Sequence, residues 1–72
     1  MSTLVKRSFS LAGHRTSVAL EPEFWTALTE IAAGRRQTLS ALIAEQDAAR
    51  APDQPLTSTL RIFALAESRR RN

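Results

Sequence analysis

The sequence contains no cysteine, which excludes disulfide bonds and thiolate metal sites. Its one histidine, His14, has no cysteine or clustered carboxylate to complete a metal site or a catalytic pair, so we interpret it as structural or as an incidental neighbour of a phosphate. No apolar run approaches the roughly 18 residues of a membrane span, and the N-terminus lacks the apolar stretch of a secretory signal. We therefore expect a cytoplasmic protein with no enzyme activity, no cofactor, no metal and no membrane contact.

Acidic residues are missing from the first twenty positions, where Lys6, Arg7 and Arg15 lie. Over the whole chain, ten Lys and Arg residues against seven Asp and Glu residues give a net charge of +3. Further basic clusters lie at residues 35–36 and 69–71. The clusters indicate either a polyanionic partner or an ordinary solvated surface. For residues 69–71 we favour stabilisation of a helix C-terminus over contact with DNA.

The length of 72 residues corresponds to one small domain. Folding buries only about 60% of the surface of an unfolded chain of this size, so the core is marginal. With no disulfide to add stability, dimerisation is the most available source of further burial.

A short strand is predicted at residues 14–20, "HRTSVAL", because β-branched and polar residues alternate there. The face that we expect to point toward the core carries Thr16, Val18 and Leu20. The opposite face carries Arg15, Ser17 and Ala19. The preceding segment, residues 6–13, also alternates and predicts either a short first strand or an N-terminal arm.

Three helices are predicted after this strand. Pro22 suits a first helical turn, and apolar residues at 3.6-residue spacing predict a helix over residues 22–34. Thr38 is a suitable N-cap for a second helix that extends to about Arg50. Residues 51–56 contain two prolines and predict a linker, after which the spacing indicates a C-terminal helix. That helix carries one apolar stripe, formed by Leu56, Leu60 and Phe63.

A lone strand needs a hydrogen-bonding partner, because its backbone groups are otherwise unpaired. One candidate is the segment at residues 6–11, which would form a hairpin through Ala12 and Gly13. The other is the same strand of a second copy, paired antiparallel about a two-fold axis. We prefer the second copy because it also enlarges the core.

The segments "RTSVALEPEFWTALTEIA" and "TLSALI" resemble the ribbon-helix-helix DNA-binding proteins of bacteria and their phages. The chain is especially similar to a small subgroup in which a Lys/Arg-rich lead-in and a Gly-His-Arg-Thr-Ser segment precede the strand. The resemblance implies a mostly α fold with a short β-strand, an intertwined homodimer and an intermolecular two-stranded antiparallel ribbon. It divides the chain into an N-terminal arm or extra strand (1–13), a ribbon-helix-helix core (14–50), and a linker with a third helix (51–72). The dimer core would contain Val18, Leu20, Trp25, Leu28, Leu42 and Ile43.

The resemblance also implies that the ribbon enters the major groove of duplex DNA, which is about 12 Å wide. The base-contacting residues would be Arg15, Ser17 and Ala19, with Arg15 bonding guanine at two atoms. Phosphates would be bound at the N-terminus of the second helix. The phosphate-contacting residues would be Thr38, Leu39, Ser40, Arg35 and Arg36, with Lys6 and Arg7 serving either as a DNA-contacting arm or as a solvated lead-in. One position departs from the family pattern, because Arg36 stands where glycine is usual.

These features predict a homodimeric transcriptional regulator, a repressor rather than an activator, that recognises an inverted repeat. The resemblance also implies that several dimers can lie side by side on DNA. The main alternative is an antitoxin-like or adaptor module whose C-terminal helix binds another protein through its apolar stripe. A second alternative is a basic protein that coats DNA without sequence preference.

Overall fold

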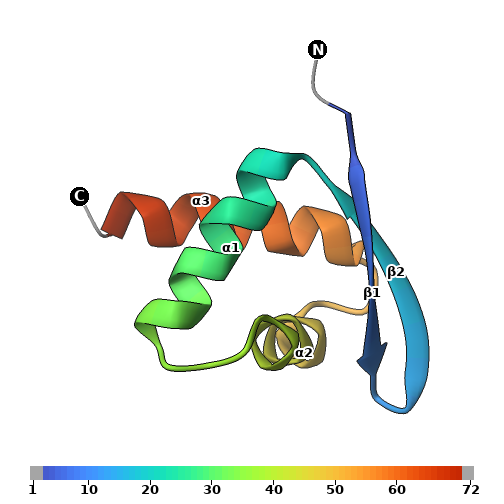
Figure 1. Ribbon diagram of the computed structural model, residues 1–72. Coiled ribbons are helices and arrows are strands. Elements are labelled where there is room, and N and C mark those ends of the chain that lie inside the picture. The colour runs from blue at the N-terminus through green and yellow to red at the C-terminus, as the bar shows by residue number, and fades with distance from the viewer. Residues whose placement is uncertain (1–2, 71–72) are drawn as a thin grey trace.

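The computed structural model describes residues 3–70, in which two strands precede three helices (Figure 1). The strands are β1 (Val5–Leu11) and β2 (His14–Leu20). The helices are α1 (Pro22–Gly34), α2 (Leu39–Ala49) and α3 (Leu56–Arg70). This element order confirms the mostly helical fold with a third, C-terminal helix.

The two strands form an antiparallel hairpin within one chain. Their register runs from the pair Val5 and Leu20 to the pair Leu11 and His14. The two-residue loop between them has positive φ at Ala12 (51°) and Gly13 (81°), as a type I′ turn requires. Residues 5–11 therefore complete one edge of β2, so β2 is not a lone strand. The lead-in is a strand and not an arm.

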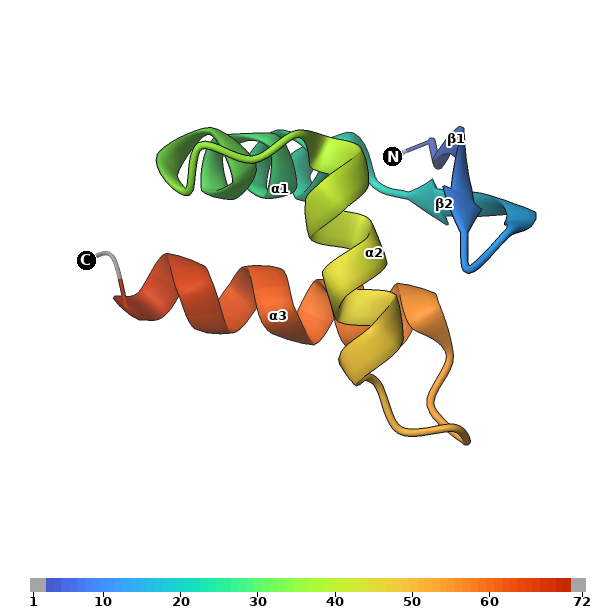
Figure 2. The ribbon, with the colours of Figure 1, turned by 90° about the horizontal axis from the view of Figure 1, so that it is seen from below.

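The hairpin lies against one side of the helices. Figure 2 shows α2 crossing between α1 and α3 on the side that faces the strands. The core takes side chains from all five elements, and no charged residue within positions 3–70 is buried. Its buried members are Phe9, Leu11, Val18, Leu20, Trp25, Leu28, Ile31, Ala32, Leu42, Ile43, Leu60 and Ala64. The six residues expected in a dimer core are thus all buried within a single chain.

The turn between α1 and α2 uses an arginine in a backbone conformation that glycine prefers. Arg36 has φ 58°, in the left-handed region. The amide of Arg36 donates to the carbonyl of Ala33 (3.1 Å), and the amide of Gln37 donates to the carbonyl of Ala32 (2.9 Å). This is the Schellman pattern that ends many helices. The departure from the family pattern at Arg36 therefore leaves the usual turn geometry in place.

The N-terminus of α2 is capped as the sequence predicts. The Thr38 hydroxyl accepts a 3.0 Å hydrogen bond from the amide of Ala41. This bond satisfies one of the amides that a first helical turn leaves unpaired. The cap orients the start of α2, where phosphate binding was expected.

Candidate nucleic-acid interface

The outward side of the hairpin gathers small polar and basic side chains from both strands. The register places Lys6 opposite Ala19, Ser8 opposite Ser17, and Ser10 opposite Arg15. These residues alternate with the buried ones, so they share the face turned away from the core. We call the six residues the hairpin face. All are exposed except Ala19, which is partly buried.

The chemistry of the hairpin face suits a polyanion. Lys6 lies near its open end and Arg15 near the turn, and neither strand contains an acidic residue. Between the two cations are short side chains, and the hydroxyl oxygens of Ser8 and Ser17 are 3.4 Å apart. Short side chains allow a partner to approach the backbone closely. Hydroxyl, ammonium and guanidinium groups all donate hydrogen bonds to phosphate oxygens or base edges.

The second edge of β2 carries backbone groups available for pairing. In a hairpin with a two-residue loop, the residues on either side of the loop, here Leu11 and His14, form a hydrogen-bonded pair. Along the two strands, hydrogen-bonded pairs then alternate with pairs that are not hydrogen-bonded to each other. The amide and carbonyl groups of Arg15, Ser17 and Ala19 therefore point away from β1. Within the described part of the chain the sheet has only two strands, so no strand lies beside this edge.

Arg7 lies on the other side of the sheet from its neighbour Lys6. The guanidinium carbon of Arg7 is 5.2 Å from the centre of the Trp25 ring, and the Trp25 indole donates a 2.8 Å hydrogen bond to the carbonyl of Val5. The same indole ring is 5.8 Å from the ring of Phe9. The structure thus places Lys6 and Arg7, for which the sequence allowed either a DNA-contacting arm or a solvated lead-in, on opposite faces of the sheet.

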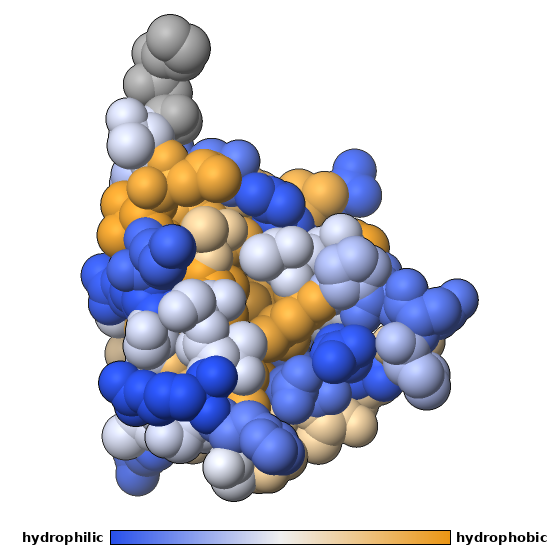
Figure 3. Space-filling view, turned by 90° about the vertical axis from the view of Figure 1, so that its right-hand side faces the viewer, coloured by the Kyte–Doolittle hydropathy of each residue, from blue (hydrophilic) through white to orange (hydrophobic). Residues whose placement is uncertain are grey.

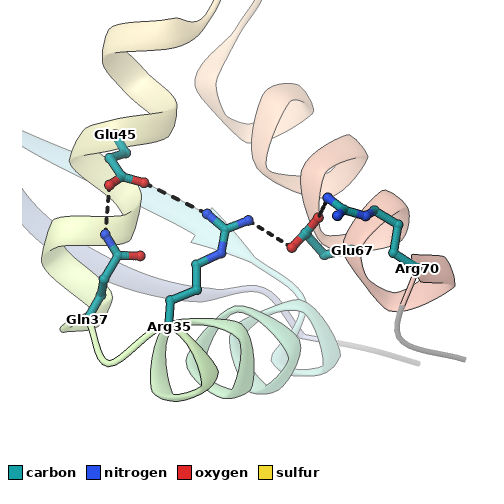
Figure 4. A network of polar contacts seen from close by, with 5 residues as sticks. All are labelled: Arg35, Gln37, Glu45, Glu67 and Arg70. Atoms are coloured by element: carbon teal, nitrogen blue, oxygen red, sulfur yellow. Dashed lines mark hydrogen bonds and ion pairs between the residues drawn. The ribbon is translucent and has the colours of Figure 1, made fainter.

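The two basic residues after α1 have different surroundings, and Figure 4 shows the polar contacts of Arg35. Arg35 donates a 2.8 Å hydrogen bond to Glu67 and lies 3.9 Å from Glu45, and its guanidinium covers the Phe63 ring at 5.2 Å. Arg36 is exposed and makes no ion pair with any residue from 3 to 70. Of this pair, Arg36 keeps its charge available to a ligand, whereas Arg35 connects the end of α1 to α2 and α3.

Two glutamates that bind arginines, Glu21 and Glu67, have lowered pKa values. The hydrogen bond from Arg35 lowers the pKa of Glu67 below its ordinary value, with a smaller contribution from Arg70. The pKa of Glu21 is also lowered, first by a hydrogen bond from the backbone and then by Arg61, whose Nε is 3.1 Å from Oε1. Both glutamates stay ionised and neutralise arginines away from the hairpin face.

The apolar stripe of α3 lies mainly in the core of its own chain. Leu60 is fully buried, and Leu56 and Phe63 pack against the core. The two large apolar side chains that α3 exposes are Ile62 and Leu65, at 59% and 57%. The stripe expected to bind a protein partner is therefore used in folding.

Sequence reasoning missed Ser8 and Ser10 as candidate site residues. The polar and apolar alternation of residues 6–11, followed by Ala12 and Gly13, was the available signal for a hairpin. Once the hairpin alternative is adopted, a period of two places both serines on the face that carries Arg15.

A family model described as "Ribbon-helix-helix domain" matches residues 4–68 of this chain. The chain belongs to the ribbon-helix-helix family. Members of this family are generally transcriptional regulators that bind DNA as dimers, and they are typically not enzymes. The match covers both strands and nearly all of α3, which extends the resemblance beyond residues 6–50.

A solved structure supports the same fold. The chain is similar to an uncharacterized protein from Bordetella pertussis Tohama I, with 34% sequence identity and a TM-score of 0.78. The matched region covers 93% of this ribbon-helix-helix chain and 57% of that protein, so the chain spans little more than half of its relative's length. No curated protein matches the sequence.

Two features are absent from residues 3–70 of the ribbon-helix-helix chain. None of the helices there combines the length and the apolar character needed to cross a bilayer. Those residues also include no group of three or more His, Asp or Glu side chains placed to hold a metal ion.

Proposed function

We propose that the protein is a homodimeric, sequence-specific DNA-binding repressor. The observation that carries the proposal is the outward row of Arg15, Ser17 and Ala19 on a strand whose second edge is open. In a chain of the ribbon-helix-helix family, such a row corresponds to the side chains that contact base edges. A repressor of this kind blocks transcription by occupying its site and needs no catalytic group.

Pairing of β2 with β2 of a second copy completes the open edge. An antiparallel pairing centred near Ser17 joins odd-numbered residues to odd-numbered residues, so both copies keep their polar side chains on one face. The sheet then has the order β1, β2, β2, β1. The side of the molecule where the strands lie also shows hydrophobic surface between hydrophilic residues, which supports contact with a second copy there (Figure 3).

The two central strands of this sheet enter the major groove. Strands lie about 4.8 Å apart and the groove is about 12 Å wide, so two strands fit. Arg15 bonds the O6 and N7 atoms of guanine, Ser17 donates or accepts a hydrogen bond, and Ala19 packs against a thymine methyl. The two-fold axis relates the two copies, which favours an inverted-repeat site.

Phosphate binding at the start of α2 positions the ribbon. The amides of Leu39 and Ser40 precede the first intrahelical hydrogen bonds, and Thr38 holds the turn in place. Arg36 adds a positive charge close to these amides. Such contacts orient the protein on duplex DNA without reading its sequence.

Selection from random duplex DNA, combined with the mass of the complex in solution, tests the proposal. We expect a dimer to enrich a symmetric site. Arg15→Ala should then weaken binding to that site by about 1–3 kcal/mol and reduce selectivity over unrelated DNA. Arg69→Ala is the control, because it removes an equal charge at the exposed end of α3. Selectivity that survives Arg15→Ala would exclude the ribbon as the element that recognises the site.

A further inference from the structure

We infer that β1 forms the rim of the DNA-binding sheet and that Lys6, Ser8 and Ser10 contact phosphates on the walls of the major groove. This inference deepens the proposed function and rests on it. The hairpin supplies the first support, because the cross-strand register aligns these three residues with Ala19, Ser17 and Arg15. When the outward face of β2 enters the groove, the outward face of β1 therefore also points toward the DNA.

The width of the sheet determines what each strand can reach. In the order β1, β2, β2, β1, with strands about 4.8 Å apart, each β1 lies about 7 Å from the two-fold axis. Half the width of the major groove is only about 6 Å. The central strands are therefore inside the groove, whereas each β1 lies over an edge, where the sugar-phosphate backbone runs. Side chains of β1 meet phosphates and not base edges.

The side chains of β1 on this face are suited to phosphate. Lys6 provides an ammonium group, and Ser8 and Ser10 provide hydroxyl donors. All three are exposed, and the hairpin carries no carboxylate that would repel a phosphate. The hydroxyls of Ser8 and Ser17 lie 3.4 Å apart, so the rim position is adjacent to a groove position. The positive charge of β1 and its position beside β2 thus both support duplex DNA as the partner of this strand.

Arg7 provides a matched comparison within the same strand. It is adjacent to Lys6, carries the same charge and is also exposed, but it lies on the opposite face over the Trp25 ring. A nonspecific effect of net charge predicts equal roles for the two residues. Contact from the rim of the sheet predicts a role for Lys6 alone.

The experiment measures the affinity of Lys6→Ala and Arg7→Ala for the selected site and for an unrelated duplex, across a series of salt concentrations. For Lys6→Ala we expect both duplexes to bind about tenfold or more weakly at 0.1 M salt. The slope of log affinity against log salt should fall in magnitude by about two for the dimer, one for each lost phosphate contact. For Arg7→Ala we expect an unchanged slope. A thermal melt of each variant confirms that it is folded.

The serines give an independent measurement. Ser8→Ala with Ser10→Ala should weaken both duplexes by a similar factor while the salt slope stays the same, because a neutral hydroxyl releases no counterion. A change in the preferred base sequence on substitution of Lys6 or either serine would overturn the inference, since it would place β1 at the centre of the groove.

Equal effects of Lys6→Ala and Arg7→Ala would also overturn it, since net charge alone would then explain the loss. In both cases the proposed function survives if Arg15→Ala still reduces selectivity for the selected site. If the unmodified protein enriches no duplex site, the proposed function itself is wrong and the rim inference is wrong with it.

Discussion

Arg35 donates a 2.8 Å hydrogen bond to Oε1 of Glu67, and this contact connects the end of α1 to α3 across 32 positions of the chain. Arg70 reaches the other carboxylate oxygen at 3.1 Å, and Phe63 lies under the Arg35 guanidinium. A basic residue that the sequence suggested for phosphate binding is therefore part of the internal ion-pair network. The contact adds to the buried Leu60 and Ala64 in joining α3 to the rest of the domain.

This ion pair makes the stability of the domain depend on pH. Because the folded protein holds the pKa of Glu67 below its unfolded value, the contribution is complete above the unfolded pKa, about 4.3. It is lost as the pH falls through the folded pKa. We expect Arg35→Gln to lower the urea midpoint at neutral pH, and the difference from the unmodified protein should shrink in acid.

Arg36→Gln is the control for this measurement, because Arg36 has no ion-pair partner within residues 3–70. Its effect on the urea midpoint should be the same at neutral and acidic pH. A difference for Arg35→Gln that stays constant down to pH 2 would show that the contact with Glu67 does not contribute to stability.

The left-handed backbone of Arg36 predicts a stabilising substitution. Arg36→Gly should raise the free energy of unfolding by about 1 kcal/mol, because glycine adopts a φ of 58° without a steric cost. Arg36→Ala keeps that cost and removes the same charge, so its stability should match the unmodified protein. Both substitutions should weaken DNA binding equally. Equal stability of the two variants in urea would exclude strain at this turn.

The packing of α3 predicts effects of different size for two of its apolar residues, Leu60 and Ile62. Leu60→Ala should lower the free energy of unfolding by about 2–5 kcal/mol, because Leu60 is fully buried and its truncation leaves a cavity. Ile62→Ala should change it by less than about 0.5 kcal/mol, since that side chain is 59% exposed. Urea unfolding of both variants makes the comparison. Little effect of Leu60→Ala would mean that α3 is not needed for the fold.

Features that depend on neighbours in the chain were accessible from the sequence. Helical periodicity located α1 and α2, the hydroxyl of Thr38 marked the start of α2, and alternation separated the buried and outward sides of β2. Each of these is set by a period of 3.6 or 2 residues, or by a cap that acts across a single turn.

Contacts between distant residues were decided only by the tertiary structure. The sequence allowed β2 two partners, and the tertiary structure shows that β1 of the same chain is one of them. Charge alone did not distinguish Arg35 from Arg36, or Lys6 from Arg7. Arg35 differs from Arg36 because it contacts Glu67, which is 32 residues away in the chain. Arg7 differs from Lys6 because it contacts Trp25, which is 18 residues away. The physical reason is that local periodicity determines which side of an element a residue occupies, whereas packing determines what that side meets.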